Sequence, residues 1–325
     1  MAFSSSLLST RIALLLIAMA SCTAMALADN AQAEILLKQG RVDEAASMLN
    51  ETLAAQPHDA QAHQLLCRVY YAQDMADSAV RECEQAVRDD ASNSDFQMWL
   101  GRAYGLKASQ VSMFSAFGVA RKVHTAFERA VQLNPANVQA MSDLGQFYVA
   151  APGVVGGGVE KAQALVSQVM PRSAAKGHRL LALIAKKKKD IPTAEAEYKS
   201  AVSAGKTAEA WVDLGQFYQE QSQPDKAVAA LESSVQANRS KNAALVDVAS
   251  ILTDLHRQPD LAEKLLREYL ASPAKTDDAP AFKVHLQLGD ILKQRGDTGG
   301  AQREYAAALA MASNYAPARK AVQGA

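Results

Sequence analysis

One six-residue sequence occurs twice in this chain of 325 residues. Asp-Leu-Gly-Gln-Phe-Tyr covers residues 143–148 and again residues 213–218, 70 positions later, and looser copies lie at 99–104 and 286–292. A turn and a small residue follow each copy and start a second apolar pattern of helical period, at Ala45, Ala79, Ala162, Ala194, Ala227, Ala262 and Ala301. This recurrence predicts a stack of helix pairs, because one pair alone cannot bury its apolar face.

The repeated unit resembles the tetratricopeptide repeat (TPR), a helix–turn–helix unit of about 34 residues. Trp211, Leu214, Gly215 and Tyr218 match the pattern of its first helix in full. The resemblance implies an all-α, right-handed superhelical solenoid whose first helices line a concave face suited to a protein segment. It implies a non-catalytic scaffold rather than an enzyme.

The repeats cover nearly all of the chain after its first 28 residues. Residues 314–325 are predicted to form a C-terminal capping helix, because a solenoid must cover its last apolar face. We predict eight units, over residues 29–57, 60–93, 94–137, 138–174, 175–206, 208–241, 243–274 and 282–313.

The first 28 residues have the pattern of a signal peptide. Arg11 precedes a short apolar run, and Ala26-Leu27-Ala28 has the form of a secretory cleavage site,. A run of nine apolar residues at 12–20 is too short to span a bilayer, which takes roughly 20,. We therefore expect an exported protein, periplasmic or secreted. The alternative is lipid anchoring in the cell envelope through Cys22, because residues 19–22 resemble a bacterial lipobox,.

Two units depart from the pattern. The third carries about ten extra residues that include Met-Phe-Ser-Ala-Phe-Gly at 113–118,. We expect its aromatic side chains to pack under the neighbouring unit; an exposed apolar knob is the alternative. The fourth unit inserts residues 151–158, expected to be a flexible loop and not a phosphate loop, because the Walker pattern is absent,. These insertions resemble those of uncharacterised exported bacterial TPR proteins.

Composition and motifs indicate no enzyme. Lys and Arg number 34, as do Asp and Glu, and this balance argues against a nucleic-acid binder,. The six His residues match no metal motif, and no cofactor is expected,. The alternative is a periplasmic enzyme or carrier, such as a glycan-processing protein, which would bring two carboxylates with separated pKa values into one pocket. The adjacent pairs Asp89-Asp90 and Asp277-Asp278 are predicted to lie in turns between units.

The side chains that first helices direct into the groove make up the predicted partner site. They are basic in the first half of the chain and acidic in the second, where Glu209, Glu220, Asp247, Asp254 and Asp290 follow one another. One hypothesis places an acidic part of a protein segment against Arg68, Arg102 and Arg179; ordinary solvated charges are the alternative. The predicted site residues are Gln64, Arg68, Tyr71, Arg102, Gln146, Arg179, Lys186 and Gln216.

Cys67 and Cys83 belong to the two helices of the second unit, at positions that face each other in an antiparallel pair. An exported protein can oxidise such a pair to a disulfide, provided that the Cα atoms lie within about 7 Å. The alternative is two small buried residues, which Cys commonly provides.

Overall fold

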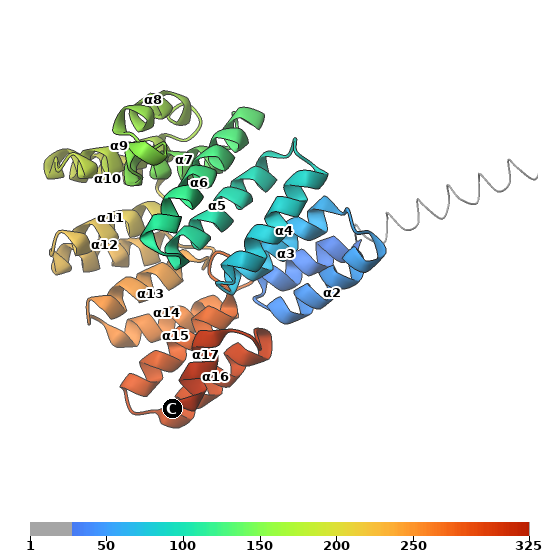
Figure 1. Cartoon of the computed structure of the whole chain (residues 1–325). Helices are drawn as coiled ribbons and strands as arrows, with labels where there is room; N and C mark the ends of the chain where they lie inside the picture. The colour runs from blue at the N-terminus through green and yellow to red at the C-terminus, as the bar shows by residue number, and fades with distance from the viewer. Residues whose placement is uncertain (1–27, 325) are drawn as a thin grey trace, which may run out of the picture.

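In the computed structural model, residues 28–324 are described, and the regular structure of this part of the chain is helical throughout (Figure 1). Residues 28–38 are helical, and a single 3-10 turn, η1 (Gly153–Val155), separates α7 from α8. The remaining helices are α2 (Val42–Ala55), α3 (Ala60–Ala72), α4 (Ala76–Asp89), α5 (Ser94–Gln110), α6 (Met113–Leu133), α7 (Val138–Ala150), α8 (Val159–Val169), α9 (Ala174–Lys187), α10 (Ile191–Gly205), α11 (Ala208–Glu220), α12 (Pro224–Ala237), α13 (Ala244–Asp254), α14 (Pro259–Ala271), α15 (Ala281–Gln294), α16 (Thr298–Met311) and α17 (Ala316–Gln323).

The helices form successive pairs followed by the single C-terminal helix α17, which confirms the predicted all-α solenoid. The first member of each pair is 28–38, α3, α5, α7, α9, α11, α13 or α15. Many first helices begin at a side-chain cap: Asp59, Asn137 and Thr207 each accept a hydrogen bond from a backbone N–H three residues on,. In the part of the chain that the structure describes, no helix has the length and apolar character needed to cross a membrane.

Small residues set the distance between the two helices of a unit. A Cβ atom on Gly215 would lie 2.8 Å from Leu231 Cδ2, closer than side chains tolerate. Ala227 on the facing helix is fully buried. The glycine of the repeated Leu-Gly pair is thus a packing requirement, because α11 and α12 approach each other where any larger side chain would push them apart.

Histidine and glutamate form the same contact in three units. His63, His178 and His285 stand four residues into their units, where the sixth unit has Trp211. Each ring Nδ1 lies 2.7–2.8 Å from a glutamate Oε2 19 residues later, on the second helix of the same pair. The glutamates are Glu82, Glu197 and Glu304. In these units a contact between histidine and glutamate therefore replaces the aromatic packing of tryptophan.

The stack of helices curves until its two ends meet (Figure 1). One apolar cluster joins Leu37 and Leu65 from the first units to Phe282 and Tyr315 from the last. The backbone N–H of Ser313 donates a hydrogen bond to Asp43 Oδ2 at 2.7 Å. The first and last units thus cover each other, and α17 shares the capping role with the N-terminal helices.

Gly40 marks the tightest point of this closure. Its φ of +80° is one that side-chain-bearing residues rarely adopt, and a Cβ atom there would lie 2.7 Å from the backbone N of Ala281,. The turn between helix 28–38 and α2 therefore touches the start of α15 in the last unit.

The two insertions differ from expectation. The prediction that the aromatics of 113–118 pack under a neighbour is wrong: Phe114 is 91% exposed, Met113 77% and Phe117 40%. These residues open α6 beyond the reach of the neighbouring unit, so nothing described covers them. Residues 151–158 are held rather than free, because Val155 is buried and a Cβ atom on Gly156 would lie 2.5 Å from the His124 ring.

Candidate functional site on the concave face

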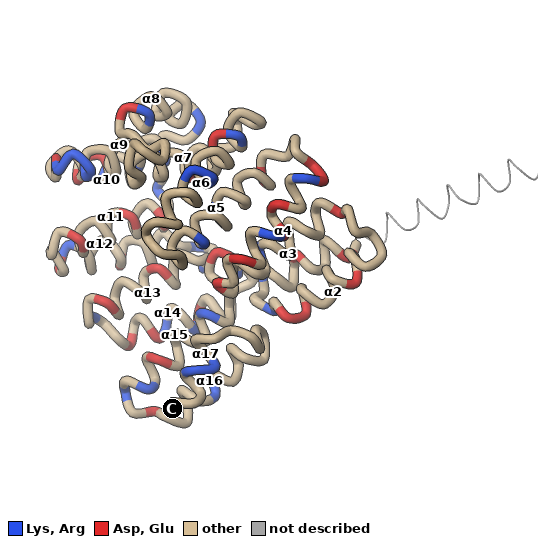
Figure 2. The backbone as a smooth tube through the Cα atoms, in the orientation of Figure 1, with Lys and Arg blue, Asp and Glu red and all other residues tan. Residues whose placement is uncertain are grey.

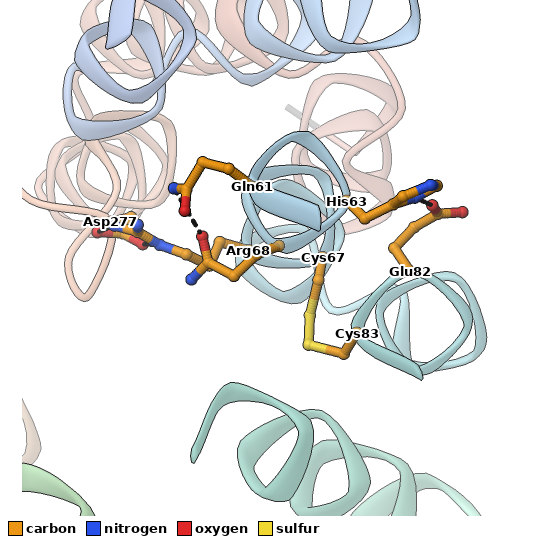
Figure 3. Close-up of a disulfide and its surroundings, with 8 residues drawn as sticks. Gln61, His63, Cys67, Arg68, Glu82, Cys83 and Asp277 are labelled. Carbon is orange, nitrogen blue, oxygen red and sulfur yellow. Dashed lines mark hydrogen bonds and ion pairs between the residues drawn. A yellow bond between two sulfur atoms is a disulfide. The ribbon is translucent and has the colours of Figure 1, made fainter. Parts of the chain in front are cut away.

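A loop between the last two units reaches the first ones at the centre of the ring. In this loop, residues 272–280, Asp277 accepts two hydrogen bonds from Arg68 of α3, from Nε at 2.8 Å and from Nη2 at 3.0 Å (Figure 3). The two side chains are only 12% and 9% exposed. The Tyr269 hydroxyl anchors the loop, since it accepts from the Thr276 N–H at 3.0 Å and donates to the Ala279 carbonyl at 2.8 Å. This ion pair is therefore part of the closure of the ring.

Three predicted site residues surround Trp99 near this loop. The guanidinium carbons of Arg68 and Arg102 lie 5.2 Å and 4.7 Å from the centroid of the indole ring, within range for cation–π attraction,. Tyr71 meets the same ring edge-on at 5.6 Å. The Nε of Arg102 also donates to Asp143 Oδ2 at 2.7 Å. The first half of the concave face is thus a closed cluster of paired groups.

Gln64 and Lys186 differ from their predicted roles. Gln64 is buried, with 4% of the residue exposed. It accepts a long hydrogen bond of 3.4 Å from Gln61 Nε2. Lys186 pairs with Glu220 of the next unit. Neither side chain is presented to a partner as a free group.

The second half of the concave face is hollowed. A cavity of about 680 Å³ opens between α7, α9, α11 and α13, the first helices of four consecutive units. Three predicted site residues line it: Gln146, Arg179 and Gln216. Both glutamine side chains are exposed, and neither bonds to another residue of the described chain 28–324. Of the predicted positions, these amides are the ones that stand open to a ligand.

Charges of both signs line the cavity. Arg179 Nε donates to both carboxylate oxygens of Asp213, each at 2.9 Å. Lys176 Nζ donates to Gln139 Oε1 at 2.8 Å. Burial lowers the pKa of Lys176, and the neighbouring Arg179 and Arg102 act in the same direction. The cavity wall on the α9 side is therefore basic, but its cations are already hydrogen-bonded to other residues of the protein.

Asp247 on the α13 side has no such partner. Within residues 28–324 no side chain donates a hydrogen bond to its carboxylate or forms an ion pair with it. Although the side chain is exposed within the cavity, enclosure by the concave wall raises its pKa to about 6, and the carboxylates of Asp213, Glu209 and Asp278 act in the same direction. Asp247 thus lies near other carboxylates and is not paired with a cation of the described chain.

Replacing Asp247 by asparagine is expected to stabilise the protein by about 1 kcal/mol at pH 7.5. A folded-state pKa above the ordinary value of 3.8 makes ionisation unfavourable to folding above that value,. The full shift is discounted because water reaches the side chain. The gain should be complete above pH 6, shrink between pH 6 and pH 4, and vanish below. Urea unfolding of wild type and D247N across this range measures it, and a gain that grows on acidification would contradict it.

The three arginines of the predicted site are neither free to bind an acidic segment nor ordinary solvated charges. Arg68, Arg102 and Arg179 are bonded to Asp277, Asp143 and Asp213 of the same chain. An acidic partner would have to displace these carboxylates, and the term solvated charge does not describe side chains that are 12–29% exposed. Figure 2 shows acidic and basic residues interspersed along both halves of the ring.

The structure joins Cys67 of α3 to Cys83 of α4 by a disulfide, with Cα atoms 5.2 Å apart (Figure 3). Both residues are fully buried. The close approach follows from the packing of the two helices, where Cys67 takes the place that Gly215 holds in the sixth unit. Cys22 and the proposed cleavage signal, apart from Ala28, lie outside the described residues.

The two adjacent aspartate pairs, predicted to lie in turns between units, have separate partners in the structure. Asp89 lies at the end of α4 and bonds to Gln85 and His58, whereas Asp277 binds Arg68. Asp213 and Asp247 do share the cavity, and both oxygens of Asp213 accept hydrogen bonds from Arg179. No group of His, Cys, Asp and Glu within residues 28–324 has the arrangement needed to hold a metal ion.

Comparison with the solved structure of yeast Tom70 supports the fold. The chain is similar to yeast Tom70, with 13% sequence identity and a TM-score of 0.52, over 87% of this chain and 57% of that one. A thermophilic TPR protein of Thermus thermophilus is 17% identical, with a TM-score of 0.47, over 70% of this chain and 99% of the other. No curated protein sequence matches the chain.

Models of the tetratricopeptide repeat match the chain in two places, residues 36–104 and residues 208–241. The first match covers the helices that carry Arg68 and Trp99, and the second covers α11 and α12 beside the cavity. The helix pairs between and beyond these matches have the same architecture and continue the same stack. The chain therefore contains tetratricopeptide repeats at residues 36–104 and 208–241, within a stack of similar helix pairs.

Proposed function

We propose that this protein is a non-catalytic scaffold that binds a segment of a partner protein in the cavity between α7, α9, α11 and α13. TPR folds typically bind protein partners, which supports the general role. The cavity supports the location, because its open amides, Gln146 and Gln216, and the unpaired Asp247 lie on the first helices α7, α11 and α13 that line it. A segment can contact such a row of polar groups along its length.

We further propose that the protein works in the cell envelope, periplasmic or secreted, with lipid anchoring through Cys22 as the alternative. The signal-peptide pattern of residues 1–28 supports export,. The disulfide between Cys67 and Cys83 supports it independently, because disulfides persist in oxidising compartments and are rare in the cytosol,.

Site-specific photocrosslinking tests the binding surface. A benzoylphenylalanine at Gln146 or at Gln216 is expected to capture the same protein segment in intact cells, as both side chains line the cavity. Lys264 on α14, the second helix of its pair, supplies the control, since its side chain is 69% exposed outside this cavity. Mass spectrometry of the crosslinked peptides identifies the segment. Equal capture from Lys264, or unrelated segments from the two cavity positions, would contradict the proposal.

A further inference from the structure

Ion pairs between arginine and aspartate link first helices of consecutive units. Arg102 of α5 binds Asp143 of α7 at 2.7 Å, and Arg179 of α9 binds Asp213 of α11 at 2.9 Å. Both aspartates hold the same place in the repeat, directly before the Leu-Gly pair. In these two steps of the stack, the preceding unit therefore supplies the cation for the aspartate of the next.

Asp247 holds this same place on α13. It lies 34 residues after Asp213, one repeat, and directly before Val248-Ala249, which are both fully buried. The preceding helix α11 offers no cation, because it contains no Lys or Arg; Gln216 follows its Leu-Gly pair where Arg102 follows that of α5. Asp247 is therefore the member of this series of three aspartates, Asp143, Asp213 and Asp247, that has no cation, and it lies on the wall of the cavity.

The surroundings of Asp247 favour a cation. Glu209 and Asp213 come from α11 and Asp278 from the central loop, and these carboxylates raise the pKa of Asp247 in addition to the effect of its enclosure. Asp254 lines the cavity from the same helix. The cations of the cavity, Lys176 and Arg179, lie on α9 and bond to Gln139 and Asp213. A bound cation would thus relieve repulsion that the protein alone leaves in place.

We propose that the cavity receives a basic side chain of the bound segment, whose guanidinium or ammonium group pairs with Asp247 as Arg179 pairs with Asp213. This inference rests on the proposed function and specifies the chemistry of the partner. The partner is then a protein segment with an Arg or Lys that enters from the concave side. The open amides of Gln146 and Gln216 would accept or donate hydrogen bonds to the backbone beside it.

Peptide selection tests the inference with a defined probe. A phage-displayed library of random dodecapeptides is selected in parallel on the full chain, on D247N and on Q216R. Wild type should enrich peptides with Arg or Lys at one fixed position. D247N removes the acceptor, and Q216R supplies an internal cation, so both should lose that preference. D254N is the matched control, because it removes a carboxylate from the same cavity wall but outside the series.

An enriched peptide is then measured by fluorescence anisotropy with its basic residue replaced by citrulline, a neutral analogue of arginine. The replacement should weaken binding to wild type about tenfold or more and should change binding to D247N less than about twofold. Binding to wild type should also weaken as the pH falls below 6, where Asp247 takes up a proton,.

The outcomes separate this inference from the function on which it rests. Enriched peptides without a fixed basic residue, or a preference that survives in both D247N and Q216R, would overturn the inference and leave the cavity as a peptide site. Failure to enrich any peptide on wild type would overturn both. Circular dichroism of the variants establishes that they are folded.

Discussion

Replacing Arg68 by alanine is expected to lower the free energy of unfolding by about 3 kcal/mol, since removing one member of a buried ion pair leaves the other charge buried and unpaired. Asp277 would be that charge, in the loop that joins the two ends of the stack. The loss also removes the guanidinium from the face of Trp99. We expect the ring to open, and small-angle X-ray scattering should show a larger radius of gyration.

A double-mutant cycle attributes this loss to the pair. Removing Arg68 and Asp277 together should cost less than the sum of the two single replacements, because no unpaired charge remains. Arg88 serves as the surface control: its side chain is 58% exposed, and its Nη1 lies 3.9 Å from Glu84 Oε2. Its replacement by alanine should cost less than about 0.5 kcal/mol. An unchanged radius of gyration in R68A would show that the apolar contacts alone hold the ring closed.

Reducing the disulfide between Cys67 and Cys83 is expected to cost about 3 kcal/mol, the entropy that a loop of this size releases to the unfolded chain. The two residues are 16 positions apart. Urea unfolding with and without dithiothreitol measures the difference. The double variant C67A/C83A should be insensitive to the reductant.

Thiol labelling determines whether the bond forms in the cell. Protein isolated from its native cells and denatured without reduction should show no labelled Cys67 or Cys83 in peptide mapping. Labelling of both residues would mean that the pair remains reduced. The disulfide would then contribute nothing to the stability of the protein in the cell.

Local pattern is sufficient to predict the helices but not the contacts between the ends. The positions of Ala227 and Gly215 follow from the period of the sequence, because they serve contacts within one helix pair. The partners Arg68 and Asp277 are separated by 209 residues, and nothing near either residue marks the other. Their meeting depends on the accumulated curvature of every unit between them, which a small change in each packing angle would alter.

The repeat period predicts some of the residues that line the cavity but not the contacts between them. Gln146 and Gln216 belong to the predicted groove, and the 34-residue interval from Asp213 to Asp247 can be read from the sequence. The missing cation beside Asp247 could not be predicted, since this requires knowing that Arg179 reaches Asp213 of the next unit rather than solvent. Exposure of Phe114 was only the alternative prediction, because an apolar residue on a helix is normally buried and the sequence does not show that α6 starts beyond its neighbour,.

The apolar cluster that Leu37 and Tyr315 share, from the two ends of the stack, changes how such a protein should melt. In a linear array of repeats the outermost units have one neighbour each, so they fray first and the array unravels inward. Here the outermost units border each other, and no unit of the ring is a free end. Loss of structure must therefore begin with a break somewhere in the circle, and until that break occurs the first and last units should exchange their amide hydrogens as slowly as those in the middle.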